Sequence, residues 1–206
     1  MSGAVSDVEV FRYDVEVLHL LVSPVHRYFG RPRDGPLPFD DGQGPASEDR
    51  DVAEVVARRG IVGDRFFGRA AHMDAAVTLV AVEALDAVAA ALGVDRFDPL
   101  LARRNVVLRG VELEPLRGRE FTLDCGGGED DAVLLAGRRP ASPCAWMDRE
   151  LAPGAHAALR GRGGLRCEPL GSGLLRRGPA VLTSPVPLDP AQAGLAVLPR
   201  GGRPLP

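Results

Sequence analysis

The apolar residues of this 206-residue chain occur in short runs, which 25 glycines and 18 prolines interrupt. The longest runs, around residues 75–82 and 87–94, are far shorter than the ~20 residues that a membrane-spanning helix needs. Runs this short favour strands, and the regular alternation of strands and helices that is typical of a doubly wound sheet is absent. We therefore expect a mainly β domain, such as a barrel, with a few short helices at its ends.

Residue patterns place the expected elements along the chain. β-rich runs predict strands at 15–23, 76–82, 106–108, 120–124, 132–136, 165–170 and 174–182. Helical spacing predicts a helix over 83–92, a short helix that opens at Asp98-Pro99, and helical turns after Pro143. The run 52–59 is too short for its periodicity to separate helix from strand.

Two segments are rich in residues that break regular structure. Residues 30–51 are dense in Gly, Pro and Asp and too polar to bury, so we expect an exposed loop there. Residues 183–206 form a Pro-rich tail with sparse apolar anchors, which we expect to be disordered or draped over the surface. The domain itself is then expected to span 15–182.

The charged residues exclude several function classes. There are 25 basic and 28 acidic residues, which leaves no basic excess for a nucleic-acid or anionic-membrane surface. Every basic residue is Arg, and without Lys this chain cannot form the Schiff base of covalent pyridoxal phosphate catalysis. The acidic first fourteen residues show no signal peptide, and the three cysteines are isolated, so we expect a cytoplasmic protein with reduced thiols.

Cys144 lies in the segment that is most informative about chemistry, RRPASPCAWM at 138–147. It follows Pro143 at the expected start of a helix, with Arg138 and Arg139 just upstream. A helix N-terminus and nearby guanidinium groups favour the thiolate, which is the form that binds a soft metal or attacks an electrophile. The alternative is a small buried residue, the commonest fate of a cysteine, and local chemistry alone favours that alternative.

Two other clusters contain arginine. In GDRFFGR at 63–69, Arg65 and Arg69 between glycines could offer forked donors to a phosphate, although a solvated turn with an Asp–Arg pair fits the spacing equally well. In Arg103-Arg104-Asn105, at a helix-to-strand junction, the Asn side chain can cap loop backbone or hydrogen-bond a heteroaromatic ligand.

The histidines have no spacing typical of a metal site. His19 lies within the first expected strand, and His26, His72 and His156 are widely scattered. A pair between Cys144 and either His26 or His72 stays open, because such partners meet only in the fold.

Taken together and in order, these segments resemble the MOSC family, the molybdenum cofactor sulfurase C-terminal domain. The resemblance runs over roughly residues 15–182, and no segment is specific by itself. Its elements are SPVH at 23–26, GIVGDRF at 60–66, VTLVAVEALDAV at 77–88, RRNVV at 103–107, LRG at 116–118, PC at 143–144 and the closing strands of 164–178.

The resemblance implies a fold and a set of site residues. It implies a β-barrel like the small barrel domain of pyruvate kinase, with molybdenum cofactor (molybdopterin) bound. Cys144 is then the catalytic residue, as a ligand of molybdenum or a carrier of persulfide. Arg65 would bind the pterin phosphate, and Arg103 with Asn105 would line the cofactor site. Pro24-Val25-His26-Arg27 stands where the family often has a P-V-K-S type motif that also holds the phosphate, so His26 and Arg27 are candidate cofactor-binding residues and a neutral His replaces a Lys.

Two function classes follow from the resemblance. The first is a molybdenum-cofactor oxidoreductase that acts on N-hydroxylated compounds. The second is a module that carries or binds sulfur or the cofactor and has no turnover of its own. Larger family members carry a pyridoxal phosphate desulfurase domain, which this chain lacks, so the partner would be a separate sulfur-donor or electron-transfer protein. A degenerate barrel that has lost the cofactor is a third reading, to which His26 lends slight support.

Overall fold

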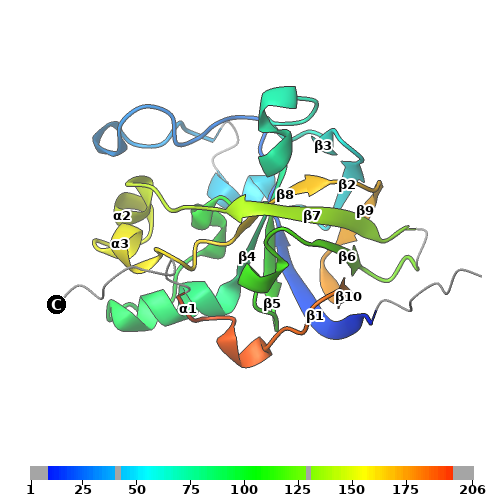
Figure 1. The fold of residues 1–206 in the computed structure, drawn as a ribbon. Coiled ribbons are helices and arrows are strands. Elements are labelled where there is room, and N and C mark those ends of the chain that lie inside the picture. The colour runs from blue at the N-terminus through cyan, green and yellow to red at the C-terminus, as the bar shows by residue number, and fades with distance from the viewer. Residues whose placement is uncertain (1–8, 40–42, 129–130, 197–206) are drawn as a thin grey trace, which may run out of the picture.

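A computed structural model describes residues 9–39, 43–128 and 131–196 of the chain. A closed barrel of seven strands forms its centre (Figure 1). Around the barrel the strands follow in the order β1 (Phe11–Leu20), β10 (Gly178–Ser184), β6 (Glu120–Asp124), β7 (Val133–Pro140), β8 (Leu165–Pro169), β4 (Val77–Ala81) and β5 (Val106–Arg109). All neighbours are antiparallel except β4 and β5, which are parallel. The expectation of a mainly β barrel with few short helices is confirmed.

Alternation of side chains along the strands fills the barrel interior. In β6, Phe121 and Leu123 point inward and are buried, whereas Glu120 is exposed. Successive residues of a strand face opposite sides, so the alternating apolar positions of every strand converge on one core. The central cluster includes Leu79, Leu108, Leu135, Leu165 and Leu182.

A second, three-stranded sheet lies beside the barrel. It consists of β3 (Gly60–Ile61), β2 (Val52–Val56) and β9 (Gly173–Arg176). The run 52–59, which periodicity could not assign, is therefore a strand followed by a turn. The single strand expected over 174–182 is two strands, because Gly178, with φ of +112°, turns the chain from the small sheet into the barrel.

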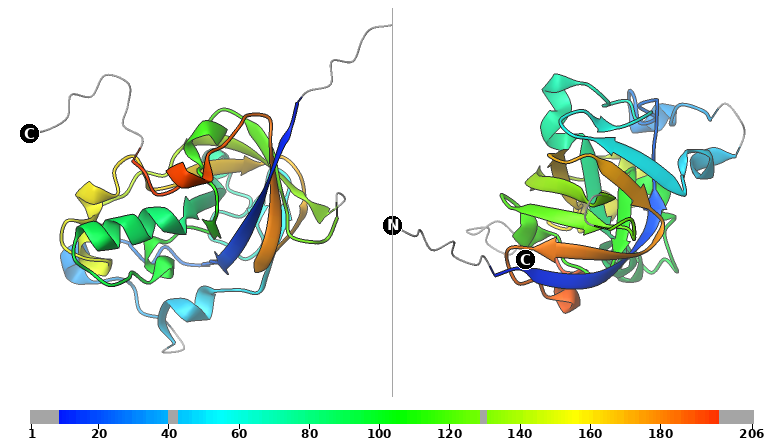
Figure 2. Two further views of the ribbon diagram at one scale, coloured as in Figure 1. Left: turned by 90° about the horizontal axis from the view of Figure 1, so that it is seen from below. Right: turned by 90° about the vertical axis from the view of Figure 1, so that its right-hand side faces the viewer.

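The helices gather at one end of the barrel, and the small sheet lies at the other (Figures 1 and 2). They are α1 (Val82–Ala91), α2 (Trp146–Glu150) and α3 (Ala155–Ala158), and they enclose a second apolar cluster that includes Leu85, Val107 and Trp146. The remaining helical pieces are short 3-10 turns: Pro32–Asp34, Gly44–Glu48, Ala70–Ala75, Pro99–Ala102, Glu114–Leu116 and Pro190–Gln192. In one of them, Asp98 caps the turn by accepting a hydrogen bond from the Leu100 amide, as the Asp-Pro pair predicts.

Two expectations about polar segments need correction. Residues 43–51 do not form a plain exposed loop, because the 3-10 turn Gly44–Glu48 folds against the barrel and buries Glu48. The composition of the segment does not predict the burial of Glu48, because the arginines that neutralise its carboxylate, Arg27 and Arg103, lie elsewhere in the chain. The domain also continues beyond residue 182. β10 runs to Ser184, and Leu188 and Ala193 pack onto the barrel, so residues 185–196 are draped over the surface, which is one of the two alternatives expected for this tail.

The rest of the tail, 197–206, lies outside the described residues, as do the first eight residues, on which the expectation about a signal peptide partly rests. No helix among the described residues is long and apolar enough to cross a membrane.

Candidate functional site

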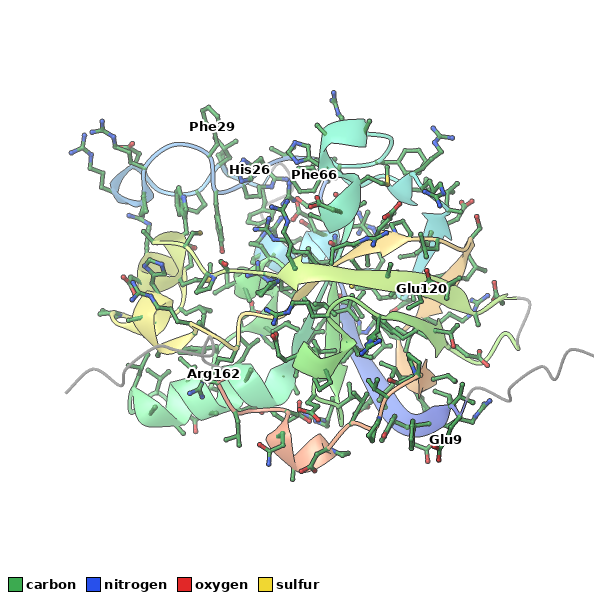
Figure 3. All side chains as sticks on the ribbon, viewed as in Figure 1. Glu9, His26, Phe29, Phe66, Glu120 and Arg162 are labelled. Carbon is green, nitrogen blue, oxygen red and sulfur yellow. The ribbon has the colours of Figure 1, made fainter. Side chains whose placement is uncertain are left out.

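A cavity of about 430 Å³ opens where the segments after β1, β3 and β7 come together. Figure 3 shows His26 and Phe66 projecting on this side of the molecule. Five arginines and two histidines line the cavity, and no Asp or Glu of the described chain does. The lining residues with polar or reactive side chains are His26, Arg27, Tyr28, Arg65, His72, Thr78, Arg103, Arg104, Asn105, Ser142, Cys144, Trp146 and Arg166. Such a lining favours an anionic ligand.

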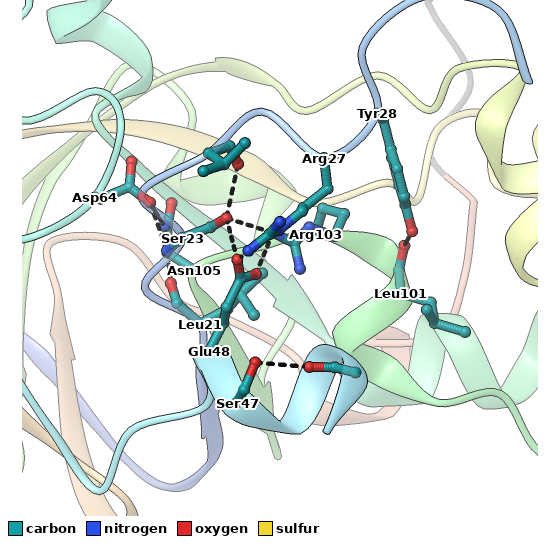
Figure 4. A network of polar contacts seen from close by, with 12 residues as sticks. Leu21, Ser23, Arg27, Tyr28, Ser47, Glu48, Asp64, Leu101, Arg103 and Asn105 are labelled. Carbon is teal, nitrogen blue, oxygen red and sulfur yellow. Dashed lines mark hydrogen bonds and ion pairs between the residues drawn. The ribbon is translucent and has the colours of Figure 1, made fainter. Parts of the chain in front are cut away.

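A buried ion-pair network forms one wall of the cavity (Figure 4). The Glu48 carboxylate accepts hydrogen bonds from Arg27 Nε at 2.9 Å and from Arg103 Nη2 at 2.5 Å. The Ser23 hydroxyl lies within 2.9 Å of the same carboxylate and accepts a hydrogen bond from Arg103 Nη2 at 2.6 Å. Arg27 also donates to the Pro38 carbonyl. Since Glu48 is 3% exposed, this network holds the wall rigidly in place.

Arg103 has a backbone conformation that is rare for its residue type. Its φ is +56° and it ends the 3-10 turn Pro99–Ala102 in the left-handed region. Such a conformation costs of order 1–3 kcal/mol and persists where the surroundings fix it, often at functional sites. Here the contacts with Glu48 and Ser23 fix Arg103, yet its Nη1 atom stays buried without a partner in the described structure.

The Asn105 amide joins three segments beneath the cavity. Its Oδ1 accepts hydrogen bonds from both the amide and the hydroxyl of Thr78, at 3.0 and 2.8 Å. Its Nδ2 donates to the Leu21 carbonyl at 3.1 Å and to Asp64 Oδ2 at 3.2 Å. Two acceptor sites and two donors are all that an Asn side chain has, so this amide has no capacity left for a ligand. Of the two roles expected for Asn105, the structure favours the one that supports backbone.

The Arg65 guanidinium stands apart from this network. No hydrogen bond or ion pair from it to the described residues is present, its Nε is buried, and its plane lies over the Phe66 ring at 4.5 Å. Burial lowers the pKa of Arg65, and the charge of Arg103 lowers it further, although Asp64 partly offsets the shift. The Arg65 amide donates to the Ser23 carbonyl, which fixes the backbone at the cavity edge. Arg65 is therefore a positioned cation with free donors.

Cys144 lies exposed at the rim, whereas Cys125 and Cys167 are buried. It precedes α2, and its carbonyl accepts the Met147 amide at 2.9 Å, so the expected position at the start of a helix is confirmed. Burial raises the pKa of both Cys125 and Cys167 and keeps them as thiols. Among the three thiols, Cys144 is the accessible one, and the alternative of a small buried residue does not describe it.

Arg104 holds the segment that carries Cys144. Its guanidinium donates to the backbone carbonyls of Gly163, Ala102 and Ala141 at 2.9–3.0 Å, and weakly to Ser142. Burial lowers the pKa of Arg104 to about 10, and the charges of Arg166 and Arg65 add to the shift. No carboxylate in the described structure pairs with it. The hydrogen bonds of the Arg104 guanidinium therefore go to backbone carbonyls, which do not neutralise its positive charge in the cavity.

Comparison with known proteins identifies the family. The model of the MOSC domain matches residues 58–181, more than half of the chain. The chain belongs to the MOSC domain family. No curated protein matches the sequence of this MOSC domain. Among solved structures, it is similar to the YuaD protein from Bacillus subtilis, at 17% identity with a TM-score of 0.61, over 85% of this chain and 98% of that one.

A second similar structure is YiiM from Escherichia coli, at 16% identity with a TM-score of 0.52, over 89% of this chain and 76% of that one. A third carries only the description of a hypothetical protein, at 16% identity with a TM-score of 0.55, over 84% of this chain and 69% of that one. These similarities support the barrel fold of the MOSC domain.

The cavity brings together the six residues to which the family resemblance gives a role: His26, Arg27, Arg65, Arg103, Asn105 and Cys144. Arg69, the other arginine considered as a phosphate donor, does not line it. The six residues differ in what they can offer a ligand. Arg27 and Asn105 donate hydrogen bonds to protein groups. Arg65 and Arg103 each have a guanidinium nitrogen without a partner in the described structure, and Cys144 has an exposed thiol. Sequence reasoning did not single out Glu48, Tyr28 or Arg166, because nothing local marks them. Of the two histidines considered as partners of Cys144, both line the cavity, and neither has a hydrogen bond to it.

Proposed function

We propose that this MOSC domain binds molybdenum cofactor and acts as an oxidoreductase on N-hydroxylated compounds, with Cys144 as a ligand of molybdenum. The observation that carries the proposal is a cavity with five arginines, no lining carboxylate among the described residues, and one accessible thiol at its rim. A pterin phosphate needs planar guanidinium donors, and molybdenum bound to dithiolene sulfur accepts a further soft thiolate.

The orphaned polar atoms of the cavity fit such a ligand. Arg65 Nε and Arg103 Nη1 are buried without partners, and a buried N–H that stays unpaired costs about 1–3 kcal/mol. Both atoms belong to guanidinium groups that line the cavity, which is where a phosphate would bind. A cavity of about 430 Å³ also lies within the usual size range of small-molecule sites.

Each residue then has a role in binding. Arg65 and Arg103 would bind the phosphate, and the Cys144 thiolate would coordinate the metal. Glu48 would keep Arg103 in place, and Asn105 would hold Asp64, the residue before Arg65. The bound cofactor supplies the two-electron redox chemistry that no side chain of the cavity has. Tyr28 stacks on Trp146, with ring centroids 4.9 Å apart, and walls the cavity with apolar surface near Cys144.

The second candidate is a module that carries sulfur or the cofactor between proteins. The exposure of Cys144 favours it, because a persulfide carrier must present its sulfur to a partner. We propose that the partner is a separate sulfur-donor or electron-transfer protein and that the site of action is the cytoplasm. Turnover of an N-hydroxylated substrate by the purified loaded protein separates the two candidates.

The variant Arg65→Gln tests the proposed cofactor site. A hydrogen bond to a charged group contributes about 1.5–3 kcal/mol, so affinity for the pterin phosphate should fall about 10–100-fold. The measurement is molybdenum and pterin content per chain after expression in a host that makes the cofactor. Arg59→Gln is the matched control, because Arg59 is exposed, stacks on Phe67 and lies outside the cavity. Equal pterin content in Arg65→Gln and in the unaltered protein would remove Arg65 from the site.

Anion binding should also depend on pH through His26. Burial, followed by the charges of Arg65 and Arg103, lowers the pKa of His26 below 6.5, so the free protein holds it neutral. A bound anion offsets those charges and raises that pKa, so binding takes up a proton and strengthens as the pH falls from the pKa of the bound form toward the lower pKa of the free form. Sulfate affinity, measured by calorimetry between pH 7.5 and 5.5, should rise severalfold, and His26→Gln should flatten the profile. Sulfate keeps its charge over this range, so an unchanged slope in His26→Gln would assign the effect to another group.

A further inference from the structure

Arg166 is a second unpaired cation of the cavity. It lies on β8, where it pairs in register with Thr78 of β4 and with Arg139 of β7. Residues in register across strands share a face of the sheet, so these three side chains lie on the outer face, opposite the buried Leu165 and Cys167. Arg166 and Thr78 both line the cavity there.

The carboxylate whose charge acts on Arg166, that of Asp74, already pairs with another arginine. Asp74 pairs with Arg139, at 3.0 Å from Arg139 Nε and 3.1 Å from Arg139 Nη2. Arg166 itself makes no side-chain hydrogen bond or ion pair with the residues that the structure describes. Burial and the Arg139 charge lower the pKa of Arg166, and Asp74 only partly opposes them. The Arg166 donors are therefore available to a ligand.

The charge of Arg166 is separate from the proposed phosphate site. The charges that act on Arg65 are those of Asp64, Arg103 and Glu48. Those that act on Arg166 are Arg139 and Asp74. The charges of Arg166, Cys144 and Arg65 all act on Arg104, and its own charge has no carboxylate partner among the described residues. Arg166 and Cys144 thus share Arg104 as a charged neighbour in the same cavity.

We infer that Arg166 forms a second anion-binding subsite in the cavity that Cys144 borders, and that the substrate which reaches Cys144 carries an anionic group, either a carboxylate or an oxyanion of the sulfate or phosphate type. The inference rests on the proposed function and deepens it, because it specifies the charge of the substrate. The guanidinium groups of Arg104 and Arg166, which pair with no carboxylate of the described chain, repel a protonated base and attract an anion. The two parallel N–H donors of a guanidinium group such as that of Arg166 match two oxygens of a carboxylate or a similar oxyanion.

Alkylation of Cys144 in the cofactor-free protein tests the subsite without loading or turnover. Iodoacetate is an anion and iodoacetamide is neutral, and the Cys144 thiolate attacks both. The ratio of the iodoacetate rate to the iodoacetamide rate therefore reports the electrostatic potential at Cys144. The fraction of Cys144 that is thiolate affects both rates equally and cancels in the ratio. The buried Cys125 and Cys167 stay protected, which the alkylated peptide verifies. Removal of one nearby charge should lower the ratio about fivefold in Arg166→Gln at low salt.

Arg138→Gln is the matched control, because the exposed Arg138 side chain pairs with Glu168 and does not line the cavity. It should leave the ratio within about twofold of the unaltered protein. A ratio in Arg166→Gln that equals the control overturns the inference. Because the protein carries no cofactor in this experiment, this result is independent of whether the cofactor is ever bound.

The same reaction identifies the anionic group. Sulfate and acetate, at matched ionic strength, should each be tested for protection of Cys144 against iodoacetamide. We expect one of them to slow alkylation at least about threefold in the unaltered protein and not in Arg166→Gln. Protection by sulfate indicates an oxyanion group of the sulfate or phosphate type, and protection by acetate indicates a carboxylate. Protection by neither contradicts the subsite.

Discussion

The variant Cys144→Ser is expected to abolish reduction of N-hydroxylated substrates, or sulfur transfer, while the barrel stays folded. Serine is nearly isosteric, but its oxygen is harder and far less acidic than a thiol, so it neither coordinates molybdenum well nor carries a persulfide. Loss of an outer-shell partner of a metal already costs about 10–100-fold in activity, so loss of a direct ligand should cost more. Cys144 is exposed at the cavity rim, so the substitution leaves the core intact.

Cys125→Ser is the control for this variant. Cys125 follows β6 and does not line the cavity. The activity of Cys125→Ser should therefore stay within about twofold of that of the unaltered protein. Thermal unfolding of both variants verifies the fold. Equal activity of Cys144→Ser and the unaltered protein would return Cys144 to an incidental surface residue.

The variant Glu48→Gln should destabilise the protein by about 3–5 kcal/mol, because removal of one partner leaves buried charges uncompensated. Both Arg27 and Arg103 would lose their carboxylate, and all three side chains are at most 7% exposed. Burial alone would raise the pKa of Glu48, but the hydrogen bonds from Arg103, Ser23 and Arg27 and the Arg103 charge lower it overall. Urea unfolding at pH 7 measures the effect.

The lowered pKa also sets the pH dependence of this contribution. The carboxylate stabilises the fold above its unfolded pKa of about 4.5, and the stabilisation is lost as the pH falls through the lower folded value. In Glu48→Gln this acid-sensitive part should be missing. Glu16→Gln is the matched control, since Glu16 pairs with Arg109 on the surface and exposed pairs contribute about 0–1 kcal/mol. A loss in Glu48→Gln no larger than in Glu16→Gln would show that the network does not hold the wall.

Local patterns were sufficient for most of the barrel. Strand β6 lies at 120–124 as expected, and α1 and β4 lie within one residue of their expected ends, because alternation and helical spacing report directly on which side is buried. The pattern failed where a single residue decides the path, as at Gly178, whose positive φ divides one apolar run between two sheets. For residues 185–196 the pattern left a disordered and a draped tail open, because sparse apolar residues are enough to pack where the barrel surface already offers a place for them.

The site could be predicted in part. Cys144, Arg65 and Arg103 lie in short motifs whose order along the chain resembles a known family, and the fold brings them to one cavity. Glu48 and Arg166 have no such signal, since their roles depend on partners that are distant in sequence. Asn105 lines the cavity as the resemblance implies, but the sequence left its role open between support of backbone and contact with a ligand. The geometry shows that its four hydrogen-bonding positions are occupied by protein groups.

Molybdenum X-ray absorption, recorded on the loaded protein and on loaded Cys144→Ser, tests the central claim most directly. The sulfur neighbours of the metal can be counted from such spectra, independently of any substrate. We predict that Cys144→Ser retains pterin and metal through the arginine end of the cavity but shows one sulfur neighbour fewer than the unaltered protein. Identical sulfur coordination in the two proteins, or absence of molybdenum and pterin from the unaltered protein after expression in a cofactor-producing host, would contradict the account.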